Sequence, residues 1–193
     1  MDSYSRKREI NKLGLETFFL NLENNHYDFN IDKLISNLEE KLNVLDKKKL
    51  NKKLDDVIEL DNEIEIIFLY KELFAISEMK IIYAYKHLEI HLKFILKASY
   101  ENSNENDFYR WESIVAFLKT KNIKLSEVSD YTKINELRNI NNSIKHSRSI
   151  INEKTKNILE FKNKKQIQYS DLLSFYKRIE NKRRYIKTKT YYP

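Results

Sequence analysis

The strongest indication of the fold is the stretch DNEIEIIFLYKELFAISEMKIIYAYKHLEIHLKFILKASY, residues 61–100. It contains no residue that breaks a helix. Leu69, Leu73, Ile76 and Tyr83 belong to an apolar series at three- and four-residue spacing. The stretch predicts one continuous helix of about 38 residues, about 57 Å long at 1.5 Å per residue. Its apolar residues lie on more than one face, which is typical of a helix that is central to a bundle or paired with another chain.

Outside this stretch, the most informative feature is the near-absence of glycine and proline. The 193 residues contain one glycine, Gly14, and one proline, Pro193. Glycine supplies positive-φ turns and close approaches to phosphate, so a Gly-rich phosphate loop, a dinucleotide fingerprint and a nucleophile elbow are excluded. The chain also lacks the turn residues that hairpin-rich β folds usually need. We therefore expect an all-α fold, an antiparallel helical bundle with one long central helix.

Further apolar patterns predict the remaining elements. Shorter helices are expected over residues 12–23, 31–46 and 109–121, then from a cap at Ser129 or Asp130 to about 147–149, and finally from Ser170 or Asp171 onward. Residues 160–170 are expected to be extended, anchored by Phe161, Ile167 and Tyr169. The expected organisation is an N-terminal helical region over 1–60, a bundle over 61–185 and a basic aromatic tail over 186–193.

The compartment is suggested by what the chain lacks. It has no cysteine, which excludes disulfides, thiolate chemistry and cysteine-based zinc sites. Residues 1–12 are charged and lack the apolar core of a signal peptide. The most apolar stretch, 64–74, contains Lys71 and Glu72 and is too short to span a bilayer. We expect a cytoplasmic protein that does not use a membrane.

Positive charge is concentrated in the last quarter of the chain. Residues 145–193 carry 14 Lys and Arg against 4 Asp and Glu, a net charge of +10, whereas residues 1–144 carry 22 − 25 = −3. A basic end of this kind is the pattern expected for phosphate contacts with a nucleic acid. The alternative is a compositional bias toward Lys, Asn and Ile, which explains the lysines better than it explains the scarcity of acids.

Two histidines, His87 and His91, are four residues apart and would share one helix face. Such a pair can bind one metal ion, but the sequence offers no third ligand. Packed or solvated histidines are the favoured interpretation, and we expect no metal and no cofactor.

The segment INELRNINNSIKHSRSI, residues 134–150, carries the most unusual polar pattern. At 100° per residue, Leu137, Ile140 and Ile144 cluster on one side of a helix. The opposite side collects Asn135, Arg138, Asn139, Asn142 and His146. An Asn-rich solvated surface is one interpretation. The other is a polar site in which Arg holds a phosphate, His transfers protons and the amides orient the substrate.

Arg138-Asn139 followed by His146, near the end of a late helix, resembles the signature of HEPN proteins. These are all-helical domains, and many are metal-independent ribonucleases of toxin, abortive-infection and CRISPR systems. The layout of residues 61–185 is also similar, with a long early helix, a middle helix, the motif helix and a final helix. One departure is the seven residues between Arg138 and His146, where the family has four to six. The phrase NNSIKH resembles divergent HEPN branches.

The resemblance implies a mechanism. His146 would act as general base or acid on the RNA 2′-hydroxyl, Arg138 would stabilise the phosphate charge with Lys145 nearby, and Asn139 and Asn142 would orient the imidazole or the phosphate. In the family the site commonly forms across a homodimer. The expected nucleic-acid contacts are Arg148, Lys182, Arg183, Arg184, Lys187 and Lys189.

These observations predict a HEPN-like RNA-binding protein, an endoribonuclease of antiphage defence or of a toxin system with a possible protein partner or antitoxin. Two alternatives stay open. One is a catalytically silent helical module for dimerisation or protein interaction, and the other is an inhibitor protein of a phage or mobile element.

Overall fold

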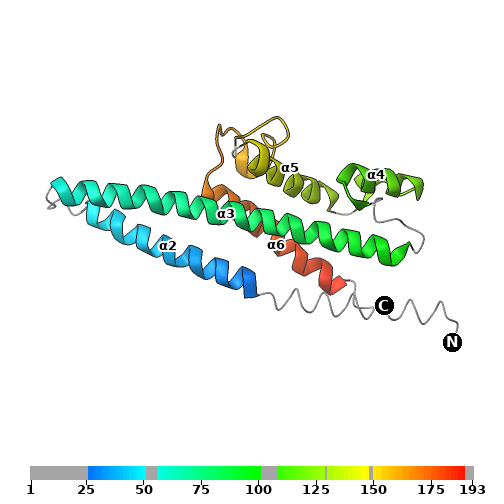
Figure 1. Cartoon of the computed structure of the whole chain (residues 1–193), viewed down its shortest axis with the longest axis horizontal. Coiled ribbons are helices and arrows are strands. Elements are labelled where there is room, and N and C mark those ends of the chain that lie inside the picture. The colour runs from blue at the N-terminus through cyan, green and yellow to red at the C-terminus, as the bar shows by residue number, and fades with distance from the viewer. Residues whose placement is uncertain (1–25, 51–55, 101–107, 129, 148–149, 190–193) are drawn as a thin grey trace. The chain divides into compact units, whose positions relative to one another are not determined.

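The structure is a computed structural model that describes residues 26–50, 56–100, 108–128, 130–147 and 150–189 (Figure 1). Over these residues the regular structure is helical, and the only β pairing is an isolated antiparallel bridge between Ile150 and Gln166. The expected all-α fold with one long helix is therefore confirmed. Within the described ranges, no helix is long and apolar enough to cross a membrane.

The expectation of an extended segment over 160–170 is wrong, because this segment begins in a 3-10 turn that ends at Phe161, forms only an isolated bridge at Gln166 and becomes helical at Tyr169. The described helices follow the predicted order. They are α2 (His26–Leu50), α3 (Asp56–Ser99), α4 (Trp111–Thr120), the 3-10 turn η2 (Leu125–Glu127), α5 (Tyr131–Ser147), the 3-10 turn η3 (Leu159–Phe161) and α6 (Tyr169–Lys189). The 44-residue α3 begins earlier than predicted. The helix expected over 12–23 lies outside the described residues. The last helix begins at Tyr169, one residue before the predicted start.

The chain divides into two compact units, described separately below. The smaller unit comprises Met1–Tyr27 and Lys86–Thr132, and the larger unit comprises Asp28–Tyr85 and Lys133–Pro193. The division into an N-terminal region over 1–60, a bundle over 61–185 and a tail over 186–193 stays a prediction.

The core of the larger unit is built mainly from α2 and the first part of α3, which run antiparallel (Figure 1). Apolar side chains at three- and four-residue spacing on both helices are buried against one another, with Tyr169 and Leu173 of α6 packed beside them. The buried set is Ile31, Ile35, Leu38, Leu42, Leu45, Leu69, Leu73 and Ile76. Three helices of this unit therefore share one core.

A buried lysine links the same three helices. The Lys80 side chain of α3 is only 4% exposed and forms an ion pair with Asp32 of α2. Its Nζ also lies 4.2 Å from the ring centroid of Tyr176 on α6, at cation–π distance. The ammonium group can be buried in the unit because its contacts with a carboxylate and an aromatic face compensate for the loss of hydration.

The smaller unit has its own apolar cluster of Leu96, Phe108, Ile114 and Leu118. The ring of Phe117 packs edge-on against Phe108 and Tyr100, with centroid distances of 4.9 and 5.1 Å. These contacts join the end of α3 to α4.

Three residues of the described chain have left-handed backbone, and none is glycine. They are Asn122, Asp130 and Asn163, with φ of 58°, 62° and 65°. Asn and Asp tolerate this region better than other side chains because their short polar groups can bond to the local backbone. The described part of this glycine-poor chain thus uses Asn and Asp where the backbone is left-handed.

Candidate active site on helix α5

Packing of α5 leaves part of its predicted polar face exposed. Leu137 and Ile140 are buried as the helical pattern predicted, and Ile144 is half-buried. Asn142 and His146 are exposed, and Asn135, Arg138 and Asn139 are half-buried. The amide and imidazole groups near the end of α5 are thus accessible to a ligand.

Two polar residues of α5, Asn141 and Ser143, are buried, and the sequence pattern did not single them out. Ser143 Oγ donates a hydrogen bond of 2.8 Å to the carbonyl oxygen of Ile150, beyond the end of the helix. Asn141 Nδ2 lies 3.5 Å from Asn142 Oδ1, and Asn141 Oδ1 has no hydrogen-bond partner among the described residues. Asn141 could have been found by helical projection, because it lies 40° from Leu137.

A surface hollow of about 410 Å³ forms where α5 meets the turn that follows it. We call it the Asn–His hollow. Its lining residues are Asn139, Asn142 and His146 of α5, together with Asn152, Glu153 and Lys154 of the turn. The α5 residues share one helix face because they are three and four positions apart. The structure therefore brings together three of the predicted site residues.

The turn that completes the hollow is fixed by its own hydrogen bonds. The carbonyl oxygen of Asn152 accepts from the backbone N–H groups of Thr155 and Lys156, at 3.0 and 2.9 Å. Asn152 Oδ1 accepts from the N–H of Lys154, and Thr155 Oγ1 accepts from the N–H of Asn152, each at 2.9 Å. Thr155 is fully buried. Such side-chain caps hold a turn without glycine, so Lys154 has a fixed backbone position beside His146.

The charges around the hollow favour an anion. Lys154 and Lys145 are exposed, and neither forms an ion pair within the described part of the chain. Glu153 is the only carboxylate that lines the hollow, and it forms an ion pair with Lys156. The remaining lining groups are three amides and the imidazole of His146, which can all donate hydrogen bonds.

An ion cluster connects α5, η3 and α6. Arg178 Nε and Nη2 donate to the two carboxylate oxygens of Glu160 at 2.6 and 2.9 Å, and Nη1 lies 2.9 Å from Glu136 Oε2. The hydrogen bonds to Glu160 raise the pKa of Arg178 above its ordinary value, against the opposing effect of burial, and Glu136 adds to the rise. The cluster fixes the segment between α5 and α6 against both helices.

The other predicted site residues are not in the hollow. Arg138 is half-buried on α5 and Lys145 is exposed, but neither lines the Asn–His hollow. Arg148 lies outside the described residues. The backbone of Lys182, Arg183, Arg184, Lys187 and Lys189 belongs to α6, and their side chains are outside the described part of the structure. Sequence reasoning missed Asn152, Glu153 and Lys154, because only the fold brings this turn back to α5.

The histidine pair of α3 makes a local contact. His91 Nδ1 lies 2.5 Å from the carbonyl oxygen of His87, one helical turn earlier. Across the described ranges, no group of three or more His, Asp or Glu side chains could hold a metal ion.

The chain was compared with protein-family models, with curated proteins and with solved structures. None of the three comparisons finds a significant match.

Proposed function

We propose that the protein is a HEPN-like RNA-binding protein that cleaves RNA without a metal ion, in the cytoplasm, as part of antiphage defence or a toxin system. One observation supports this most directly. The Asn–His hollow combines, in one accessible place, a histidine, three amides and a lysine that forms no ion pair among the described residues. These groups can bind a phosphate and move a proton, which is what cleavage of RNA by its own 2′-hydroxyl requires.

The proposed reaction uses the lining residues in separate roles. His146 accepts the proton of the 2′-hydroxyl while the 2′-oxygen forms a bond to the adjacent phosphorus. The bond from phosphorus to the 5′-oxygen breaks, and that oxygen takes a proton from water. Lys154 stabilises the extra negative charge on the phosphate, and the amides of Asn139 and Asn142 orient it. The products are a 2′,3′-cyclic phosphate and a 5′-hydroxyl.

The geometry supports one change from the mechanism that the resemblance implies. The family pattern assigns the phosphate contact to Arg138, whereas Lys154 is the cation that lines the hollow beside His146. We assign the contact to Lys154 and retain Arg138 as the competing candidate. Single variants of the two residues distinguish these assignments.

The test is cleavage of end-labelled single-stranded RNA in EDTA, with the product ends identified chemically. His146→Ala is expected to lower the rate about a hundredfold or more. Lys154→Ala is expected to lower it about tenfold to a hundredfold, as loss of a charge-stabilising group does. Lys162→Ala is the matched control, because Lys162 is exposed on the same segment and does not line the Asn–His hollow.

Two results would contradict the proposal in different ways. Full activity in His146→Ala would remove the histidine from the mechanism and the nuclease assignment with it. A larger loss in Arg138→Ala than in Lys154→Ala would return the phosphate contact to Arg138.

A second candidate function, self-association without catalysis, is favoured by the surface of α3. Leu60, Ile64, Ile67, Phe68 and Met79 are all exposed, and Phe68 is 63% exposed. At 100° per residue they fall within an arc about 120° wide, roughly opposite to buried Leu73. We call this set the α3 apolar stripe. Exposed apolar residues gathered on one helix face can mark an interface, and a second copy of the chain is the proposed occupant.

A further inference from the structure

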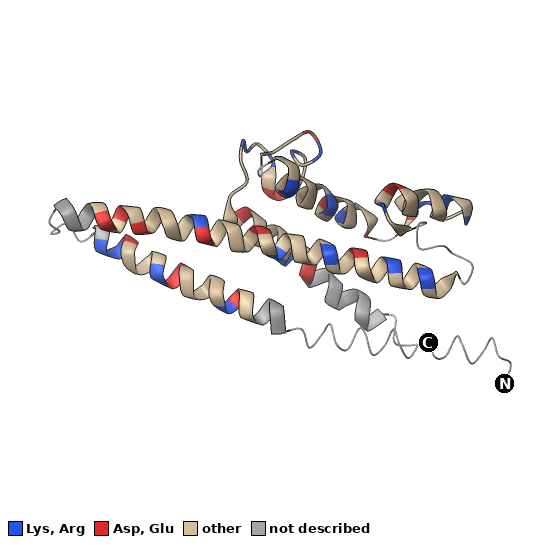
Figure 2. Cartoon of the chain, viewed as in Figure 1, with Lys and Arg blue, Asp and Glu red and all other residues tan. Residues whose placement is uncertain are grey.

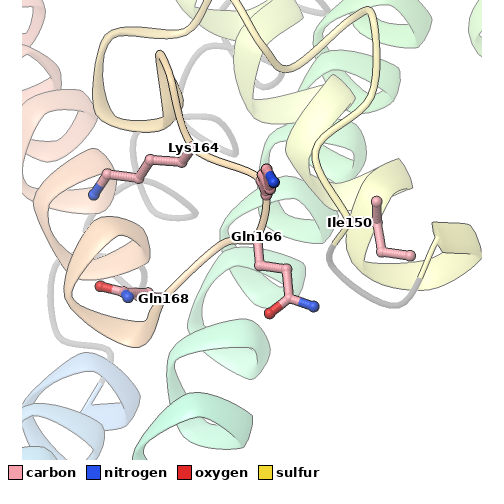
Figure 3. A pocket seen from close by; sticks show the side chains of 5 residues that line it. Ile150, Lys164, Gln166 and Gln168 are labelled. Atoms are coloured by element: carbon pink, nitrogen blue, oxygen red, sulfur yellow. The ribbon is translucent and has the colours of Figure 1, made fainter.

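A second hollow of about 560 Å³ lies beside the segment that connects α5 to α6. It is lined by Ile150, Lys164, Lys165, Gln166 and Gln168, and we call it the Lys–Gln hollow. Figure 3 shows Gln166 between Ile150 on one side and Lys164 with Gln168 on the other. None of the roles argued above uses these residues.

The walls of this hollow are fixed within the fold. Ile150 pairs with Gln166 in the isolated bridge, and its carbonyl oxygen accepts the hydrogen bond from Ser143. On the other side, the buried carboxylate of Asp171 accepts the backbone N–H of Gln168 at 3.1 Å and forms an ion pair with Lys164. A ligand would therefore meet a largely preformed surface, at a low ordering cost.

The lining groups select an anionic ligand with several acceptor oxygens. No carboxylate lines the hollow, and the nearby Asp171 is engaged by Lys164. Lys165 is exposed and forms no ion pair in the described ranges. Gln166 and Gln168 are exposed amides that can donate to phosphate or sugar oxygens. Figure 2 shows further Lys positions along this segment.

The two hollows share one short piece of backbone. Ile150 lines the Lys–Gln hollow and Asn152 lines the Asn–His hollow, so at most about 7 Å of chain separates the two residues. A single phosphate group can occupy only one hollow, so a ligand that reaches both must carry at least two phosphates, as an RNA chain does. Proteins that bind single strands use such rows of donors along the nucleic-acid backbone.

We infer that the Lys–Gln hollow is a second subsite for single-stranded RNA, which holds a phosphate of the backbone close to the phosphate in the Asn–His hollow. This inference depends on the proposed function for the identity of the ligand. It adds a residue, Lys165, whose contribution to binding affinity is larger for a long RNA than for a short one.

The experiment measures fluorescence anisotropy with labelled RNA of 2 and 12 nucleotides, in a His146→Ala background that prevents cleavage. Lys165→Ala is expected to weaken binding of the 12-mer about tenfold, to leave the 2-mer, which has one phosphate, within about twofold, and to lower the salt slope for the 12-mer by about 1. Lys162→Ala, the control on the same segment, is expected to change binding of either RNA by less than about twofold.

Three results would overturn the inference. They are equal effects of Lys165→Ala and Lys162→Ala on the 12-mer, an equal loss for the 2-mer and the 12-mer, and equally tight Lys165-dependent binding of poly-glutamate. The last result would assign the hollow to acidic polypeptides. Failure of the subsite is distinguishable from failure of the nuclease. Cleavage that requires His146 but is indifferent to Lys165 contradicts only the subsite, whereas Lys165-dependent binding without cleavage supports it.

Discussion

At the scale of single residues, the least expected group is Lys80. Its ammonium is buried while its partner Asp32 is 58% exposed, so the two halves of the ion pair differ in environment. Removing a partner from a buried charge costs more than removing the buried charge itself, because the remaining ion then lacks both water and a counterion. The pair should therefore respond asymmetrically to substitution.

Asp32→Asn is expected to lower the free energy of unfolding by about 2 kcal/mol, and Lys80→Met by about 1 kcal/mol or less. Urea denaturation of the two single variants and of the double variant measures this. In the Lys80→Met background the Asp32→Asn change should cost almost nothing. Additive effects in the double variant would show that Asp32 does not act through Lys80.

The sequence was informative about a site residue when its neighbours in the site lie on the same helix. Asn139, Asn142 and His146 were predicted to share a face because helical spacing is local. Lys154 and Asn152 could not be placed, because their approach to α5 depends on the contact between Ser143 and Ile150. Lys80 was equally inaccessible to sequence reasoning, since a charged residue in an amphipathic pattern is usually solvated.

At the scale of elements, the segment between α5 and α6 combines irregular backbone with firm attachment. Two of its three predicted anchors, Phe161 and Ile167, are buried, while Tyr169 is half-buried. Arg178 of α6 donates a hydrogen bond to Glu160, and Ser143 of α5 donates one to the carbonyl oxygen of Ile150. Because both hollows border residues 150–154, the Ser143 bond supports both of them.

Ser143→Ala is expected to leave the carbonyl group of Ile150 without this bond and to lower stability by about 1 kcal/mol. Amide hydrogen exchange over residues 150–156 should become faster, while exchange in α2 should change little. Ser174→Ala, at an exposed position of α6, is the control. Unchanged exchange over 150–156 would mean that the turn is held by Thr155 and Asn152 alone.

At the scale of the whole molecule, the fold class was the most predictable property. Absence of glycine and proline from residues 61–100 is a feature of the sequence itself, and a long helix follows from it. The arrangement into two compact units could not be derived, because it depends on which apolar faces pack together. The exposed side of α3 could not be derived either. Apolar residues all around a helix predict that it is buried, but they do not identify the surface that covers it.

The α3 apolar stripe predicts that the chain of 23.5 kDa forms a dimer. Phe68→Asp is expected to shift the mass measured by light scattering toward that of a single chain, because the charge would be buried in the interface. Leu159→Asp is the matched control, since Leu159 is 74% exposed in the same unit but lies on η3. A wild-type mass equal to one chain at high concentration would exclude self-association through the stripe.

The enclosure of Lys80 also makes it a natural reporter of how often the larger unit opens. Amine-acylating reagents modify lysines whose Nζ is accessible and unprotonated, so the exposed lysines of the native protein react first. Lys80 becomes reactive only when α2, α3 and α6 separate far enough to release it from Asp32 and Tyr176. The rate at which this one amine is acylated, followed by peptide mass spectrometry, would thus report how readily the bundle opens without any introduced label.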